Sequence, residues 1–350
     1  MQNSFDIVIA TRNRPEALKL SIPYLLNNQD RLPEKFIIVD ASDDHEAVRK
    51  TLDGIKNNLH QVVEITLIKS AFASSSYQRN LGLDLVTADV VIFPDDDSMF
   101  FPHAVDAMMQ VYDLDTNQEI AGVCAAESIK PPPDFPVGSV YKEKISDTIR
   151  KMIGRFRYKA EHILCPDPFY LFGRKMISRY IPLIFFGQNN VVQVEYMTGF
   201  RMSFRSEIIK KHKFSEVFCG YCLFEDTDAS FSTYKSGMLV GARNALIYHH
   251  KFPTKRSSGF IMGLLPVLNR AYIVAKHAPN DKRLLVHLKI YCLYKFIQYL
   301  VGGLKSQYAK DRARGASFGL KNMERLLSAT TQQEVDHEYT TILNKIAAHQ

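Results

Sequence analysis

Three consecutive carboxylates, Asp95, Asp96 and Asp97, are the residues of this chain with the clearest capacity for chemistry. They come two residues after an apolar run at 89–93. Closely spaced carboxylates on a loop suit Mg²⁺ or Mn²⁺, which prefer oxygen ligands and share them with phosphates. Taken alone, the run would also suit a solvated acidic turn that caps a helix near Phe101. A cation site is therefore predicted only if other polar groups gather beside it.

Apolar strands and helices alternate over the first hundred residues, and these elements must position the carboxylates. The spacing of apolar residues predicts strands at 5–10, 35–40, 62–68 and 89–93, a helix opening at Arg14-Pro15, and a helix over 76–85. Pro23 is expected to kink or shorten the first helix. This alternation is typical of a parallel sheet covered on both faces by helices, and such sheets bind ligands at the carboxyl ends of their strands.

Polar residues follow three of the predicted strands: Thr11-Arg12-Asn13, Asp40, and the run of three carboxylates. Their convergence predicts a ligand site at one edge of the sheet. Asp40 could accept a hydrogen bond from the N3–H of a pyrimidine, and it could equally serve as a turn or helix-cap residue.

A second acidic group, Glu225-Asp226, precedes a predicted helix at 229–236. A carboxylate here could act as a general base if it is ionised and within hydrogen-bond reach of a hydroxyl. Asp226 or Asp228 could instead cap the helix. Gly199 indicates either a close approach of backbone to a ligand or a turn that needs positive φ.

The remaining chain is assigned more coarsely. We predict a helix at 104–111, a short helix from Ser206, and strands at 120–124, 191–197, 238–240 and 245–248. Residues 134–190 match no pattern, and the chain is expected to be helical and basic from about Gly259 onward.

Seven segments in this order resemble the family 2 glycosyltransferases. They are IVIATRNRPEAL (7–18), FIIVDASDD (36–44), SSYQRNLGL (75–83), VIFPDDDSMFFPHAV (91–105), MTGFRMSFR (197–205), FEDTDASF (224–231) and LIYHH (246–250). The resemblance runs from residue 5 to about 276. It implies an α/β chain with the GT-A fold, a Rossmann-like arrangement for nucleotide-diphospho-sugar transfer, with a mostly parallel sheet flanked by helices.

The resemblance also implies roles for individual residues. Asp95 and Asp97 match the DXD pattern of the family, with Asp97 as the direct metal ligand, Asp95 beside it, and His249 or His250 completing the metal site. The residues implied to contact the nucleotide or diphosphate are Thr11, Arg12, Asp40, Arg79, Asp95 and Asp96. Asp226 is the implied general base with Glu225 beside it, and the acceptor side comprises Gly199, Tyr221, Phe224 and Asp228. Many members carry a tryptophan before the ED motif; this chain has none, so Tyr221 or Phe224 is expected to supply that surface.

The expected activity is metal-dependent transfer of one sugar, of hexosyltransferase type and with inversion, from a UDP- or dTDP-type donor to an acceptor hydroxyl. The cofactor is Mn²⁺ or Mg²⁺, and the acceptor is a glycan or glycolipid of cell-envelope or other polysaccharide synthesis. Two alternatives remain. A nucleotidyltransferase shares the sheet topology, but its usual glycine-rich loop is missing from Thr11-Arg12-Asn13-Arg14-Pro15. A catalytically inactive, membrane-associated glycan-binding protein would not need both Asp97 and Asp226.

The net charge of +7 is unevenly distributed, because residues 251–321 carry fourteen Lys or Arg against Asp281 and Asp311. We expect a catalytic domain over 1–250, with a donor half at about 1–125 and an acceptor half at about 126–250, followed by a helical basic extension at 251–350. The extension predicts contact with an anionic membrane surface. Internal packing is the alternative. No nucleic-acid module is recognisable.

Location follows from the cysteines and the apolar runs. An odd number of cysteines, five, and no visible signal peptide predict a cytoplasmic protein with reduced thiols, peripheral on the inner face of the cytoplasmic membrane. Lys289 and Lys295 argue against a spanning helix at 284–304. Cys219 and Cys222 form a lone CxxC, which lacks the second ligand pair that a zinc site would need.

Overall fold

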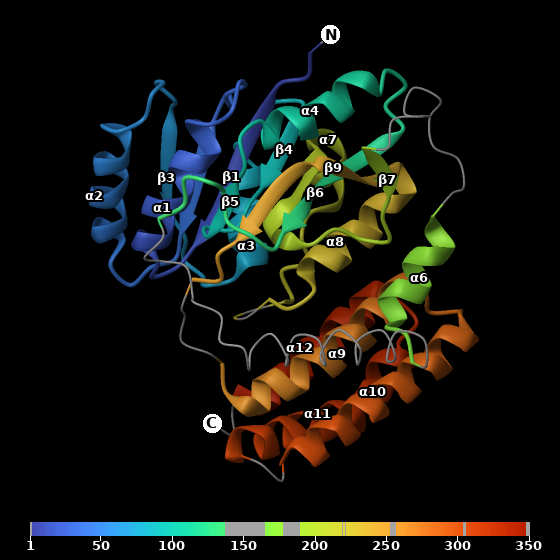
Figure 1. Ribbon diagram of the computed structural model, residues 1–350. Coiled ribbons are helices and arrows are strands. Elements are labelled where there is room, and N and C mark those ends of the chain that lie inside the picture. Colours follow the sequence, from blue (N-terminus) through green and yellow to red (C-terminus); the bar gives the residue numbers. More distant parts are fainter. Residues whose placement is uncertain are drawn as a thin grey trace. The chain divides into compact units, whose positions relative to one another are not determined.

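The fold is described from a computed structural model of the chain (Figure 1). The structure describes residues 2–136, 165–177, 190–218, 220, 222–252, 257–303 and 306–347. The chain forms two compact units, the first comprising Met1–Pro132 and Met176–Lys255 and the second Pro133–Lys175 and Arg256–Gln350. The division near residue 255 lies close to the expected domain boundary. The described residues 133–136 and 165–175, which we expected in the acceptor half, cluster with the second unit.

A single mixed sheet forms the centre of the first unit. Its strands are β1 (Phe5–Thr11), β2 (Phe36–Asp40), β3 (Ile65–Lys69), β4 (Val90–Phe93), β5 (Ser98–Phe100), β6 (Ile120–Ser128), β7 (Val191–Gln193), β8 (Met202–Arg205) and β9 (Met238–His249). The order is β3-β2-β1-β4-β8-β6-β9-β5, with β7 paired to β9. The strands β3, β2, β1 and β4 run parallel, whereas β8 is antiparallel to both β4 and β6. The predicted parallel sheet is therefore present and is extended by antiparallel strands.

Helices cover both faces of this sheet. They are α1 (Pro15–Leu26), α2 (His45–Lys56), α3 (Ser75–Leu83), α4 (Ala104–Leu114), α7 (Ser206–His212) and α8 (Glu225–Thr233). Alternate strand residues point to opposite faces. Ile7 and Ile9 therefore pack with α1, α2 and α4, whereas Val8 packs with α3, α7 and α8. Strands buried on both faces explain why the sequence shows continuous apolar runs here.

Several local expectations change. The region that the sequence divides into two short strands is one strand, β9, and the predicted strand at 62–68 is shortened to β3. Pro23 lies inside α1 without ending it, because the helix continues to Leu26. Neither α2 nor β5 was expected.

The second unit is helical. It contains α9 (Gly259–His277), α10 (Lys282–Gly303), α11 (Gln307–Leu327) and α12 (Gln332–Ala347), and it includes most of α6 (Pro168–Met176). A partly buried ion pair helps to hold α10 in it: Arg270 Nη2 lies 2.5 Å from Asp167 Oδ2, and the Tyr291 hydroxyl of α10 donates to the same oxygen over 3.1 Å. Glycines let α9 and α11 touch, since a Cβ on Gly315 would lie 1.9 Å from the Phe260 carbonyl oxygen.

By length and composition alone, α10 could cross a membrane, so excluding it because of Lys289 and Lys295 was too strict. Core helices of soluble proteins pass the same test. The contacts of Tyr291 with the rest of the unit show that one face of α10 packs on protein.

Candidate active site

The carboxyl ends of β1, β2 and β4 bring the predicted donor residues to one edge of the sheet. Thr11, the last residue of β1, is in register with Asp40, the last residue of β2. The amide of Gln78 on α3 donates to the Thr11 carbonyl oxygen over 2.8 Å and to the Val39 carbonyl oxygen over 2.7 Å. One buried side chain therefore joins the ends of two neighbouring strands.

Asp96, the middle carboxylate, faces inward and is almost fully buried. The Thr11 hydroxyl donates to its Oδ2 over 2.7 Å, and Arg14 Nη1 lies 2.7 Å from its Oδ1. Burial raises the pKa of Asp96 to about 7, against the lowering effect of Arg14. Both oxygens are thus occupied by protein groups, and the geometry assigns Asp96 to holding the loop rather than to direct contact with a donor.

Asp97 has three kinds of polar neighbour. Arg14 Nη2 lies 2.5 Å from Oδ2, the Phe252 amide donates to the same oxygen over 2.9 Å, and His249 Nε2 lies 3.1 Å from Oδ1. Burial opposes ionisation, but His249 and Arg14 outweigh it and hold the pKa of Asp97 below its usual range. The His249 contact is an ion pair without hydrogen-bond alignment, and Oδ1 has no hydrogen-bond partner within the part of the chain that the structure describes.

Asp95, Asp97 and His249 form a candidate metal site, because one ligand atom from each lies within 4.8 Å of the others. Two carboxylates and an imidazole suit Mn²⁺ well, and Asp97 Oδ1, which accepts no hydrogen bond from the described residues, supplies an oxygen that can ligate. The His249 ring stacks on Phe200 at a centroid distance of 4.6 Å, which fixes its orientation. The sequence left His249 and His250 open; the cluster contains His249, whereas the His250 amide donates to the Asp97 carbonyl oxygen.

Arg79 on α3 connects the carboxylate loop to α8. Its Nη2 lies 3.0 Å from Asp95 Oδ1 and its Nη1 lies 2.7 Å from Glu225 Oε1. The guanidinium also sits over the Phe214 ring, 5.5 Å from the centroid. Its side chain is only 4% exposed. Burial raises the pKa of Glu225 to about 7, against the lowering effect of Arg79.

Asp226 lies beside this pair in the first turn of α8. The Gly199 amide donates to its Oδ2 over 2.7 Å, and the Thr227 amide donates to its Oδ1 over 2.7 Å. Burial raises the pKa of Asp226, and the two N–H groups oppose that rise. A carboxylate that two backbone donors orient, and whose pKa burial raises, is suited to receive a proton from a hydroxyl. The cap of α8 is the backbone of Phe224, so neither Asp226 nor Asp228 caps this helix through its side chain.

Asp40 is fully buried, and its oxygens are occupied. Oδ1 accepts from the amide and hydroxyl of Ser42, and Oδ2 lies 2.7 Å from Nδ1 of His45. The structure therefore shows Asp40 in the role of a turn residue. Its contact with a pyrimidine base stays a prediction, and it would need Ser42 or His45 to move. Arg12 is more than half exposed, 4.0 Å from Asp43, so its role as a donor contact also stays a prediction.

The structure gives a different outcome for each of the predicted acceptor-side residues. Gly199 lies close to the side chains of Arg79 and Asp226, and its φ is not positive, so the turn interpretation is wrong and the approach to a ligand stays a prediction. Phe224 adopts φ 73° at the start of α8 and is half-buried. Asp228 is corrected: it is fully buried and accepts from the Ser215 hydroxyl over 2.5 Å, which makes it a structural residue of α8. Tyr221 and Cys219 lie outside the described residues.

Sequence reasoning missed two residues of this site, Arg14 and Gln78. Arg14 was taken as the start of a helix, yet it binds two of the three carboxylates. The signal available was its place, four residues after the predicted end of a strand that was expected to border the site. Nothing in the sequence pattern of a polar glutamine on a helix indicates that it is buried between two strand ends.

Comparison with known proteins agrees with this geometry. Residues 6–181, half of the chain, match the family described as glycosyl transferase family 2. The chain belongs to glycosyl transferase family 2. A comparison with curated protein sequences found no match.

Solved structures place this family 2 member in the GT-A fold. TarS 1–349 from S. aureus, solved with UDP-GlcNAc, superposes with a TM-score of 0.52 at 13% identity, covering 99% of this chain and 92% of TarS 1–349. The mannosyltransferase PcManGT from Pyrobaculum calidifontis, solved with GDP-Man and Mn²⁺, superposes with a TM-score of 0.50 at 14% identity, covering 99% of this chain and 87% of PcManGT. The predicted family and the predicted GT-A fold are confirmed, and the chain is a glycosyltransferase.

Proposed function

We propose that this glycosyltransferase moves a hexose, with inversion, from a UDP- or dTDP-type nucleotide sugar to an acceptor hydroxyl, and that it needs Mn²⁺ or Mg²⁺. One observation carries the proposal: Arg79 pairs both with the candidate metal ligand Asp95 and with Glu225, the chain neighbour of the candidate base Asp226. The structural neighbours PcManGT and TarS 1–349 hold GDP-Man with Mn²⁺ and UDP-GlcNAc, respectively.

Asp95, Asp97 and His249 would hold the cation, which when bound neutralises charge on the departing diphosphate. The low pKa of Asp97 keeps its carboxylate ionised and available as a ligand. Arg14 pairs with Oδ2 of Asp97 and with Oδ1 of Asp96, and these two contacts hold the carboxylate loop in place.

Asp226 accepts the proton of the acceptor hydroxyl. The Gly199 and Thr227 amides fix the orientation of its carboxylate, and its raised pKa makes proton uptake more favourable than at an ordinary aspartate. Glu225 and Arg79 anchor α8 next to the carboxylate loop, which keeps Asp226 in register with the donor.

We also propose that the acceptor is a glycan or glycolipid of envelope or polysaccharide synthesis, and that the protein works in the cytoplasm on the inner face of the membrane. The support is the basic segment 251–321.

A screen of UDP-, dTDP- and GDP-linked hexoses for donor hydrolysis with Mn²⁺ or Mg²⁺ tests the proposal. We expect turnover of one donor class, its loss in Asp97→Ala, and a fall of about 10²–10⁴-fold in transfer for Asp226→Asn. Asp53→Asn, which changes an exposed carboxylate on α2, is the matched control and should behave as wild type.

Full activity of folded Asp97→Ala and Asp226→Asn would overturn the mechanism. Pyrophosphate release from a nucleoside triphosphate and a sugar phosphate would instead indicate a nucleotidyltransferase. Binding of UDP with Mn²⁺ but no turnover of any donor would indicate an inactive glycan-binding protein.

A further inference from the structure

The helix α10 carries apolar side chains on a face that the rest of the protein does not cover. Val286, Ile290, Leu293 and Ile297 follow one another at helical spacing, so they lie on one side of the helix. Their side chains, with those of Leu300 and Val301 at the end of the same face, are 48–60% exposed. The opposite face is buried in the second unit through Leu284, Leu288, Tyr291 and Cys292. The helix is therefore apolar on both its inner and its outer side.

The neighbouring helix α11 carries a cationic face with the same spacing. Lys310, Arg314 and Lys321 lie on one side of α11 together with Ser317, and all three cations are exposed. Arg314 has an ion pair with Asp311 at 3.4 Å, and neither Lys310 nor Lys321 is paired with a carboxylate of the described residues. The sequence of α10 contains no acidic residue. The two helices pack against each other, as the 2.8 Å ion pair between Lys289 and Glu324 shows.

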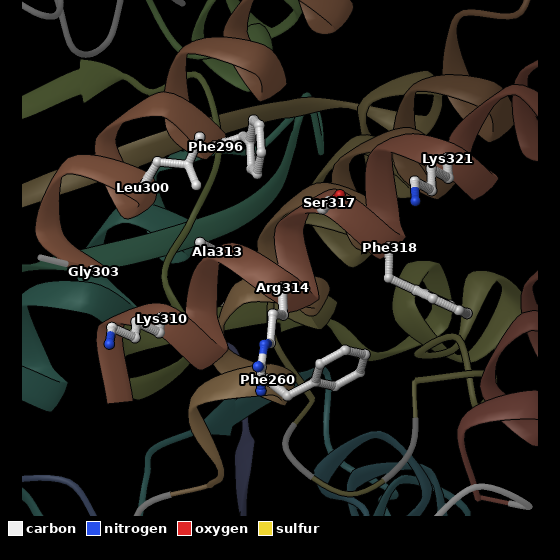
Figure 2. Close-up of a pocket in the computed structure, with 10 residues that line it drawn as sticks. All are labelled: Phe260, Phe296, Leu300, Gly303, Lys310, Ala313, Arg314, Ser317, Phe318 and Lys321. Carbon is white, nitrogen blue, oxygen red and sulfur yellow. The ribbon is translucent and has the colours of Figure 1, made fainter. Parts of the chain in front are cut away.

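A cavity of about 630 Å³ lies between these helices and α9 (Figure 2). Phe260, Phe296 and Leu300 form apolar walls, and the cations Lys310, Arg314 and Lys321 belong to its lining. Cavities of roughly 300–1,000 Å³ hold small-molecule ligands in proteins. Leu300 belongs both to this cavity and to the outer face of α10, so the two features are continuous.

We propose that the C-terminal helical unit docks on a bilayer and binds one anionic phospholipid there. An acyl chain of the lipid enters the cavity beside Phe260 and Phe296, and its phosphate binds Lys310 and Arg314. The outer face of α10 lies in the interface between headgroups and acyl chains, with Lys321 facing the anionic surface. This combination of an apolar face and adjoining cations is what an interfacial helix needs.

Charge and packing decide between this occupant and the others. A second copy seated on the same face would bring two sets of exposed α11 cations together, which opposes association. A spanning role would require α10 to leave the contacts of its inner face, including the Tyr291 bond to Asp167. An anionic lipid surface satisfies the apolar face and the cations at once.

Vesicle sedimentation of the full-length protein tests the proposal. We expect binding to vesicles of equal parts phosphatidylcholine and phosphatidylglycerol, and weak or no binding to phosphatidylcholine alone. Lys310→Gln/Arg314→Gln should weaken binding roughly thirtyfold, since each cation near such a surface strengthens binding roughly five- to sixfold and the two factors multiply. Leu293→Ser/Ile297→Ser should weaken it by about tenfold or more.

The matched controls change exposed cationic and apolar side chains of the first unit, away from α10 and α11. Lys50→Gln/Lys56→Gln changes two exposed lysines of α2, and Val62→Ser changes a fully exposed apolar residue of the first unit. Both should bind vesicles as wild type does. Circular dichroism should show every variant folded, as expected for changes at exposed positions.

The cavity is tested separately with Ser317→Phe, which places a ring in it. This variant should lose binding of a soluble short-chain phosphatidylglycerol in calorimetry, and inorganic phosphate should neither bind the wild type nor compete with that lipid. Phosphate binding with the same affinity as the lipid would overturn the lipid assignment.

Equal binding to both vesicle types, or unchanged binding by the α10 and α11 double variants, would overturn the proposal. Concentration-dependent dimers that Leu293→Ser/Ile297→Ser dissolves, without lipid binding, would do so in favour of a second copy. The test is independent of sugar transfer, because Asp226→Asn should bind vesicles as wild type does.

Discussion

Replacing Arg79 by Gln is expected to destabilise the first unit strongly, because Arg79 is the buried link between α3, α8 and the carboxylate loop. The contact with Asp95 adds little, since that carboxylate is 35% exposed and water can replace the guanidinium; such pairs contribute about 0–1 kcal/mol. The contact with Glu225 is different, because that side chain is only 10% exposed. Leaving a buried charge without its partner costs about 3–5 kcal/mol. We therefore expect a loss of roughly 3–5 kcal/mol, a large part of the ~5–15 kcal/mol typical of a domain.

The loss should depend on pH in a defined direction. In the folded protein the pKa of Glu225 is raised to about 7. At pH values between the ordinary pKa of a glutamate and about 7, the folded state therefore holds a proton that the unfolded state does not. The contribution of Glu225 to stability is therefore present at low pH and is lost as pH rises through the folded pKa. Without Arg79 the folded pKa rises further. The cost of Arg79→Gln should consequently be larger above that pKa than below it.

Urea unfolding followed by circular dichroism, at one pH on each side of neutrality, measures both effects. Arg49→Gln is the matched control: Arg49 pairs with Glu46 on the surface of α2, and its loss should change stability by less than about 0.5 kcal/mol. Arg79→Gln/Glu225→Gln should recover at least about 1 kcal/mol relative to the sum of the single variants. A cost for Arg79→Gln below about 1 kcal/mol, or a cost that shrinks as pH rises, would refute the reasoning.

Three further outcomes are expected. Burial raises the pKa of both Asp226 and Glu225, and a general base must be ionised to act. We therefore expect kcat/KM for transfer to fall as pH drops through these raised pKa values. A pH–rate profile that stays level down to the ordinary pKa of a carboxyl group would contradict this. Gly315→Ala should destabilise the second unit by about 1–3 kcal/mol or more, since its Cβ would meet the Phe260 carbonyl, whereas Gly54→Ala, with open space around it, should stabilise α2 by about 0.5–1 kcal/mol; thermal unfolding of both variants shows whether the signs differ. Chelation with EDTA should abolish donor turnover and Mn²⁺ should restore it, and turnover that persists after chelation would count against a metal-dependent reaction.

The strands that carry the site could be predicted from the sequence because they are buried on both faces. Their apolar runs end abruptly in polar residues, and parallel strands bring those ends to one edge. Thr11 and Asp40 lie side by side for this reason. The choice between His249 and His250 could not be made from alternation alone, because it depends on the pairing of His249 with Ser98 of β5, a strand that was not expected.

Tertiary contacts account for most of what the sequence did not show. Arg79 and Glu225 are far apart in the chain, and no local pattern indicates that α3 and α8 bring them together. The role of Asp40 changed because His45, at the start of an unexpected helix, occupies its second oxygen. Asp228 was expected on the acceptor side because the family resemblance places it beside Asp226, but in α8 its side chain accepts a hydrogen bond from Ser215.

Calorimetric titration of UDP with Mn²⁺ tests the central claim, a metal-dependent nucleotide site with a separate base, most directly. It compares wild type, Asp97→Ala and Asp226→Asn. We expect wild type and Asp226→Asn to bind with equal affinity, because Asp226 acts on the acceptor, and Asp97→Ala to bind at least about tenfold more weakly, as loss of a metal ligand requires. Equal binding by Asp97→Ala, with or without Mn²⁺, would contradict the claim.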